Sequence, residues 1–495
     1  MRGIAALVLA GVALRAALLA AALPLGIQAD EANYLYGALA LERFGFQLDH
    51  YRFLWPPGYV WWLAQLTGPD GLLGLGGGAA GIDAARVSQV VASALTGTFT
   101  SLFAWRLFSA RAALVAGALW AFHLPLASYT HFLFAESLFL PPFLGGLWFL
   151  LLALDRLDAA RPAGAHLVLS GLAFGAALHL KEFPLFLVPL LGLLVAVRAL
   201  RQSAGWVEAL RRGSLVPLVA FTTLLPWSLR CAEVYGQPVL AGATLGENVY
   251  GGLNAATRNF DYRALSLPRM RAGLDTIEGR ARPLFAPPAG DPAVPPAWPR
   301  IEESPHTLRR QAQNTRRGLA FAAEHPGHVA RTRMQRLADW VTPFSFTARH
   351  LALGHYPEES SLSGTLRRPV LLLSSATSIV VLLGGLLGAL LTLRRGAGRA
   401  VALSALSYAL ATAGLVSMSR FRVPVEPVLI ALAAGFIAHG ATLEHVPGGD
   451  AGPRRSNVLR VACGAAGALA LGFLWWVTWP QFSGAFAMAW HGGVE

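Results

Sequence analysis

Two acidic residues, Asp30 and Glu31, stand side by side directly after the first apolar segment of the chain, residues 4 to 23. A carboxylate at the boundary of a bilayer is costly unless it is solvated, paired or used. The neighbours Asn33 and Tyr34 indicate an aqueous loop, so the pair is a candidate for chemistry at the membrane surface. The alternative is that Asp30 only caps a surface helix, whose first turn favours negative charge.

Cationic side chains that suit a phosphate occur at other predicted membrane boundaries. Lys181 is the only lysine of the chain and lies in a tight turn before Pro184. Its ammonium is a compact point charge, whereas the forks of Arg420, Arg422 and Arg230 can bind phosphate oxygens bidentately. The alternative is that these side chains only anchor helix ends to ordinary lipid phosphates.

Glu136 and His131 are candidate metal ligands, because they lie close together near the start of a further apolar segment. A carboxylate suits magnesium, calcium or manganese, and a histidine favours zinc or manganese. The alternative for His131 is an ordinary polar residue near the interface.

The composition predicts a polytopic all-α membrane protein. Of the 495 residues, 55% are hydrophobic and only 14% are charged. The mean hydropathy is +0.49, too apolar for an ordinary soluble domain. A helix that crosses a hydrocarbon core of about 30 Å needs about 20 apolar residues. The sequence predicts about eleven such spans, at residues 4–23, 86–108, 111–128, 133–154, 165–181, 184–200, 214–232, 369–393, 400–416, 424–443 and 458–479.

Arginines in the short loops predict how the chain is oriented in the membrane. They all share one side if the N-terminus is cytoplasmic: Arg106, Arg111, Arg156, Arg161, Arg198, Arg201, Arg211, Arg212, Arg394, Arg395, Arg399, Arg454 and Arg455. The loop that carries Asp30 is then outside. The net charge of +13 is spread over loops at both faces, which argues against a nucleic-acid partner.

The segments between the spans predict three regions. An N-terminal transmembrane module, 1–235, contains an outer loop, 24–85, with an amphipathic helix over 30–44 and a second interfacial piece from Pro56. Residues 236–366 form a long extracytoplasmic region with a Pro-rich stretch at 281–300 and helices over 307–324 and 326–341, and residues 367–495 form the last spans. We expect the helix over 326–341 to place Ala330, Met334, Leu337 and Val341 on one apolar face and its arginines on anionic headgroups.

The order of these motifs resembles the GT-C membrane glycosyltransferases, and in particular the superfamily of protein O-mannosyltransferases and aminoarabinose transferases. The motifs that carry the resemblance are Asp30-Glu31, Pro56-Pro57-Gly58, Glu136 in Phe-Ala-Glu-Ser-Leu-Phe, Lys181-Glu182, Pro226-Trp227 with Arg230 and Tyr235-Gly236, His325-Pro326, and Ser419-Arg420-Phe421-Arg422-Val423-Pro424. The resemblance implies a GT-C-like bundle with an outward-facing site and a polyprenyl-phosphate sugar as donor. It places the family's acidic pair at Asp30 and Glu31, its second outer acid at Glu136 and its lipid-phosphate lysine at Lys181.

Two departures from the family pattern concern the substrates. Asn33 stands where the aminoarabinose transferases usually carry a basic residue, which argues against that subfamily's substrate. The sequence shows no clear counterpart of the soluble carbohydrate-binding module of eukaryotic O-mannosyltransferases. The acceptor therefore stays open among protein, glycolipid and polysaccharide.

Sugar transfer to a hydroxyl needs a base for the acceptor proton and positive charge for the departing phosphate. We expect Asp30 to be the base of an inverting transferase, with Glu31 orienting the acceptor or binding a divalent cation (magnesium, manganese, calcium or zinc). Lys181, Arg420, Arg422 and Arg230 are the candidates for the phosphate. The expected enzyme is a hexosyl- or pentosyltransferase of the bacterial cytoplasmic (inner) membrane, in contact with membrane lipids and facing the periplasm or exterior.

The alternative function is a flippase for lipid-linked sugars or another transporter. A transporter places ionisable residues near the midplane of several spans, whereas here they lie at outer boundaries, with Arg15 and His179 as partial exceptions. A third class, a non-catalytic scaffold, would bind the donor without turnover.

Overall fold

The computed structural model describes most of the chain, and the statements below concern only these residues. They are 2–27, 31, 34–35, 37–38, 41, 55–67, 79–202, 204–242, 245–254, 304–343, 346–352, 356, 361–362, 364–392, 406, 408, 419–439 and 455–491. Within them the regular elements are helices, and no strand occurs. Asp30, the Pro-rich stretch 281–300 and most of the predicted span 400–416 lie outside the described residues.

The first half of the chain forms ten helices among the described residues: α1 (Arg2–Ala22), α3 (Pro57–Thr67), α4 (Ala79–Leu107), α5 (Ala110–Phe122), α6 (Leu124–Ser128), α7 (Glu136–Asp158), α8 (Gly164–Leu178), α9 (Pro184–Arg201), α10 (Trp206–Thr222) and α11 (Leu225–Tyr235). The remaining helices are α12 (Leu245–Gly252), α14 (Ser304–Glu324), α15 (Pro326–Trp340), α16 (Phe346–Ala352), α17 (Arg367–Thr392), the 3₁₀ helix η2 (Ser419–Val425), α19 (Glu426–His439) and α20 (Arg455–His491).

Several of these helices are long and apolar enough to cross a membrane. Among the described residues they are α1, α4, α7, α9, α17 and the segment from Arg420 to His439. The pair α10 and α11 passes the same test as one span bent by 47°. The prediction of an all-α polytopic membrane protein is therefore confirmed, while the count of eleven spans and the three region boundaries stay predictions.

Prolines explain where two predicted spans are broken. The predicted span 111–128 is divided at His123, and Pro125 stands in the first turn of α6. The predicted span 214–232 bends between α10 and α11, where Pro226 opens the second helix. Proline lacks an N–H and clashes with the preceding turn, so it is accommodated at a helix start and interrupts a continuous helix.

Glycines allow the helices of the bundle to approach closely. A Cβ on Gly192 of α9 would lie 2.5 Å from the carbonyl oxygen of Gly213 on α10. A Cβ on Gly388 of α17 would overlap the carbonyl oxygen of Leu432 on α19. Lipid tails are as apolar as the side chains of the helices, so the hydrophobic effect does not drive transmembrane helices together. They associate instead through close van der Waals packing, which small residues allow.

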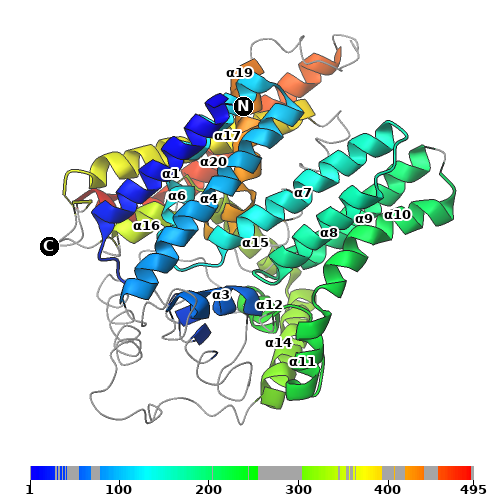
Figure 1. The fold of residues 1–495 in the computed structure, drawn as a ribbon. Helices are drawn as coiled ribbons and strands as arrows, with labels where there is room; N and C mark the ends of the chain where they lie inside the picture. The colour runs from blue at the N-terminus through cyan, green and yellow to red at the C-terminus, as the bar shows by residue number, and fades with distance from the viewer. Residues whose placement is uncertain are drawn as a thin grey trace.

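The two ends of the bundle differ in what they carry (Figure 1). The N-terminus and the connections from α7 to α8 and from α9 to α10 lie at one end, whereas α3, α12 and α14 gather at the other. The arginine distribution predicts the same grouping, with short basic loops on one side and the interfacial helices on the other. The end that carries α3 is called the outer end below, and its outward orientation stays a prediction.

Helix α15 does not bury the apolar face that the sequence predicts. Met334 is 58% exposed, whereas Thr332, Arg336 and Asp339 are buried. Burial raises the pKa of the Asp339 carboxyl to about 7, although the charge of Arg336 acts in the opposite direction. The buried Arg336 therefore does not lie on headgroups as the sequence predicts, while the rest of the predicted headgroup face, with Arg331 exposed, stays a prediction.

Candidate functional site

Three of the predicted site residues meet at the outer end of the bundle. The Oε1 atom of Glu136 accepts a hydrogen bond from Lys181 Nζ at 2.9 Å and lies 3.4 Å from Arg420 Nε. These residues come from the start of α7, the turn between α8 and α9, and η2. We call Glu136, Lys181 and Arg420 the outer charge cluster.

Glu136 is held at a position that favours its negative charge. It is the first residue of α7, and the N-terminus of a helix carries partial positive charge. The residue is only 2% exposed. Its second oxygen, Oε2, is buried without a hydrogen-bond partner among the described residues. The side-chain contacts that fix the carboxylate are thus made through Oε1.

The turn that carries Lys181 is fixed by contacts with two other helices. The N–H of Gly58, at the start of α3, donates to the carbonyl of His179 at 2.8 Å. The Nε2 atom of His179 lies 2.9 Å from the carbonyl oxygen of Thr223, and the Lys181 N–H donates to Ala177. The motif Pro56-Pro57-Gly58 therefore serves to dock α3 on this turn, and only a glycine allows that approach.

Arg420 reaches Glu136 from η2 and also rests on an aromatic ring. Its guanidinium carbon lies 4.2 Å from the centre of the Phe134 ring, a distance at which a cation is attracted by the ring face. The side chains of Arg420 and Lys181 are 15% and 23% exposed. Both cations are accessible from solvent, although the carboxylate between them is not.

Glu31 supports the segment that leads into Glu136. Its side chain is fully buried, and Oε1 accepts a hydrogen bond from the Leu133 N–H at 2.8 Å. Arg86 approaches the same oxygen to 4.0 Å. Glu31 thus stabilises the turn before α7 in addition to any role toward an acceptor. Its neighbour Asp30 lies outside the described residues, so its role stays a prediction.

His131 makes its side-chain hydrogen bond with α1. Its Nε2 lies 3.0 Å from the carbonyl oxygen of Arg15, so this nitrogen carries the proton. Burial lowers the pKa of His131 to about 4, which leaves the ring neutral at neutral pH. No group of three His, Cys, Asp or Glu side chains that could hold a metal occurs among the described residues. Metal binding by Glu136 and His131 therefore stays a prediction.

The other two arginines predicted to bind phosphate have different surroundings. Arg422 is 1% exposed, and its Nε donates to Glu426 at 2.9 Å. Arg230 is partly exposed on α11, where it pairs with Glu233. The structure therefore brings Lys181 and Arg420 together with Glu136, whereas Arg422 and Arg230 each pair with a carboxylate of their own.

Sequence reasoning missed three residues that support the site. Arg86 and His123 were not singled out, and Phe134 was noted only as part of a motif. A signal existed for the arginine, since a charge at the beginning of an apolar helix needs a partner. His123 and Phe134 carried no such signal, because their contacts with Glu426 and Arg420 join residues about three hundred positions apart.

The comparison with protein families gives one match. Residues 73–227 match the family described as dolichyl-phosphate-mannose-protein mannosyltransferase. The matched part contains Glu136 and Lys181, and it confirms for this part of the chain the resemblance seen in the sequence. A search of curated proteins found none that matches.

Solved structures with a similar arrangement have low sequence identity to this chain. The oligosaccharyltransferase of Archaeoglobus fulgidus in the apo form has a TM-score of 0.49 at 15% identity, with 100% of this chain and 56% of that chain covered. The same enzyme with zinc and sulfate has a TM-score of 0.48 at 15% identity, with 100% and 53% covered. ArnT from Cupriavidus metallidurans bound to undecaprenyl phosphate has a TM-score of 0.35 at 19% identity, with 87% and 78% covered. The chain spans about half the length of the archaeal enzyme.

The docking of α3 on the Lys181 turn gives a first prediction. In Gly58→Ala the new Cβ would lie 2.7 Å from the His179 carbonyl oxygen, so α3 or the turn must shift. We expect a loss of about 1 to 3 kcal/mol of stability, as for overpacked cores. The measurement is the thermal unfolding midpoint of the purified protein in detergent.

Gly164→Ala is the matched control, because nothing lies within 4 Å of a Cβ at that position, at the start of α8. Alanine there should leave the midpoint unchanged or raise it slightly. Equal midpoints for Gly58→Ala and the wild type would contradict the docking role of Gly58.

Proposed function

We propose that this chain is a membrane glycosyltransferase that moves a sugar from a polyprenyl-phosphate donor to a hydroxyl acceptor at the outer end of the bundle. The observation that carries the proposal is the outer charge cluster, in which Lys181 and Arg420 converge on one carboxylate oxygen of Glu136. The family match over residues 73–227 supports the same class of reaction.

The cluster is suited to an anion such as a phosphate. A carboxylate oxygen and a phosphate oxygen are both negatively charged hydrogen-bond acceptors, so the donors that hold Glu136 Oε1 can hold a phosphate oxygen. Within the cluster two cations contact one carboxylate. Lys181 and Arg420 are the partly exposed members, so an incoming phosphate meets the cations first.

The transfer is a displacement at the anomeric carbon of the sugar. The acceptor oxygen forms a bond to that carbon while the bond between the carbon and the phosphate oxygen breaks. The acceptor proton passes to Asp30, and the bonding electrons leave with the phosphate. Lys181 and Arg420 stabilise the charge that grows on the departing phosphate, which lowers the barrier. Attack opposite the leaving group inverts the configuration.

Glu136 and Glu31 have supporting roles in this proposal. When a phosphate binds Lys181 and Arg420, the carboxylate of Glu136 is released from these two cations. Its two oxygens then become available to an acceptor hydroxyl or a divalent cation. Glu31 holds the turn before Glu136 through the Leu133 N–H. The metal, if used, would supply further positive charge at the phosphate.

The finer assignments belong to the same proposal. The sugar is a hexose or a pentose, and the acceptor is a hydroxyl of a protein, glycolipid or polysaccharide. The site faces the periplasm or exterior of a bacterial cytoplasmic membrane, as the loop arginines predict. The carrier is a polyprenyl phosphate, the class of lipid to which the undecaprenyl phosphate bound to Cupriavidus metallidurans ArnT belongs.

Both residues that could have indicated a transporter have structural partners. Arg15 is fully buried in α1, donates to the carbonyls of Gly11, Trp120 and Ala121, and lies 3.9 Å from the centre of the Trp120 ring. His179 binds the carbonyl of Thr223. These contacts join helices of the bundle, so neither residue favours a transport pathway.

Substitutions of Lys181 and Glu136 should change phosphate binding in opposite directions. Lys181→Met removes a cation that holds the phosphate, and Glu136→Gln removes the charge that competes with it. Charge-assisted hydrogen bonds contribute about 1.5 to 3 kcal/mol, so each change should be about tenfold or more. The measurement is calorimetric titration of undecaprenyl phosphate into the purified protein in detergent.

Glu208→Gln is the matched control, because Glu208 also binds two arginines, Arg211 and Arg212, but in the first turns of α10. It should leave the affinity unchanged. Weaker binding by Glu136→Gln, as weak as that of Lys181→Met, would contradict the competition between carboxylate and phosphate.

Asp30→Asn tests the chemical step. It should abolish transfer from a panel of polyprenyl-phosphate sugars, read as release of free lipid phosphate, while undecaprenyl phosphate still binds. A variant with unchanged turnover would remove Asp30 from the mechanism.

A further inference from the structure

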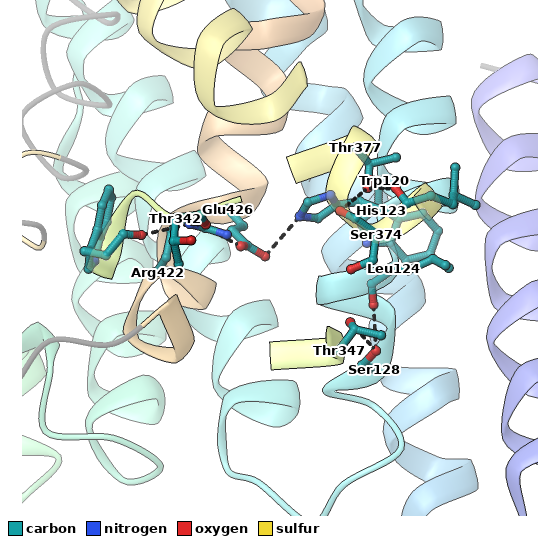
Figure 2. A network of polar contacts seen from close by, with 12 residues as sticks. Trp120, His123, Leu124, Ser128, Thr342, Thr347, Ser374, Thr377, Arg422 and Glu426 are labelled. Carbon is teal, nitrogen blue, oxygen red and sulfur yellow. Dashed lines mark hydrogen bonds and ion pairs between the residues drawn. The ribbon is translucent and has the colours of Figure 1, made fainter. Parts of the chain in front are cut away.

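A second buried charge network, drawn in Figure 2, shares η2 with the outer charge cluster. Glu426, the first residue of α19, stands between two partners, with Oε1 2.9 Å from Arg422 Nε and Oε2 3.2 Å from His123 Nε2. All three side chains are at most 1% exposed. A carboxylate only accepts hydrogen bonds, so Nε2 of His123 carries the proton that faces it.

Arg422 extends the network to the end of α15. Its NH1 donates to the carbonyl oxygens of Trp340 and Thr342, both at 2.8 Å. The last carbonyls of a helix lack partners within the helix and carry partial negative charge, which a guanidinium satisfies. The network therefore joins three parts of the chain: the break between α5 and α6, the junction of η2 with α19, and the C-terminal end of α15.

Stability alone is a poor explanation for this network. Removing two charges from water costs several kcal/mol each, and apolar residues of similar size often stabilise a core better than a buried ion pair. Ionisable groups are rarer still within a membrane bundle. The charged groups instead restrict geometry. The Arg422 guanidinium is bound to three acceptors, which permits few arrangements of the elements that it joins.

The arrangement matters because Arg422 and Arg420 share η2. A 3₁₀ helix has about three residues per turn, so residues two positions apart point to different sides. Arg422 points to Glu426 and the end of α15, and Arg420 points to Glu136. Fixing one arginine by three acceptors therefore fixes the direction of the other.

We propose that Glu426, Arg422 and His123 are positioning residues, which lock η2 to the end of α15 and thereby place Arg420 at the donor phosphate. The inference rests on the proposed function for the role of Arg420. It adds that the end of α15, part of the long stretch between α11 and α17, is connected to the phosphate site through two hydrogen bonds that the Arg422 side chain donates to main-chain carbonyl oxygens. A shift of that stretch would then change how well the donor is held.

The mechanical part of the proposal is tested by hydrogen exchange on the full-length protein in detergent. Arg422→Lys keeps the charge but loses the fork, and His123→Phe removes the N–H that faces Glu426 while Arg422 still pairs the carboxylate. Both should accelerate exchange in η2 and at the end of α15 together. Acceleration confined to α19, or none, would overturn the lock.

The matched control for exchange is Arg198→Lys. Arg198 forms the same kind of fork with Asp158, with Nε 2.6 Å from Oδ1, at the opposite end of the bundle. It should leave exchange in η2 and α15 unchanged. If Arg198→Lys also accelerated exchange in η2 and α15, the loss of any arginine–carboxylate pair would loosen the fold. That result would overturn the specific role of Arg422.

The functional part is tested by a double-mutant cycle on the affinity for undecaprenyl phosphate. Arg422→Lys and Arg420→Ala should each weaken binding, by about tenfold. The double variant should bind about as weakly as Arg420→Ala alone, because an Arg420 misplaced by Arg422→Lys already contributes little to the binding free energy. Multiplying losses would overturn the positioning role. If Arg420→Ala alone left the affinity unchanged, the proposed function would be refuted. Hydrogen exchange would still test whether Arg422 holds η2 to the end of α15.

Discussion

The contact of Glu136 with Lys181 and Arg420 is the interaction on which the rest of the site depends. Two cations at the edge of a bilayer repel each other, and a buried carboxylate between them allows both to stay close. The carboxylate in turn tolerates burial because it has these partners and a helix N-terminus. The proposed phosphate site is thus held together by contacts within the protein itself.

Several other contacts near the outer end hold the elements that carry this arrangement. Glu31 fixes the turn before α7, and the Gly58 contact fixes the turn of Lys181. Arg422 and Glu426 fix η2. In a bundle surrounded by lipid, apolar packing alone discriminates weakly between neighbouring arrangements, so hydrogen bonds of charged groups supply much of the geometric specificity.

The sequence allowed the elements to be predicted better than their contacts. The apolar segments and prolines located α1, α9, α17 and the turn of Lys181, because these features act within a few residues. Glu136, Lys181 and Arg420 were recognised as candidates, but Glu136 was assigned to a metal rather than to the two cations. Its contacts join residues 45 and 284 positions apart and depend on helix packing, which no local pattern encodes. The buried face of α15 was missed for the same reason.

The most direct test of the central claim is a structure of the full-length protein with undecaprenyl phosphate, solved by electron cryomicroscopy in lipid nanodiscs. The account predicts that the phosphate lies between Lys181 and Arg420 and that the Glu136 carboxylate has left both cations. A phosphate bound elsewhere, with the three side chains still in contact, would contradict it.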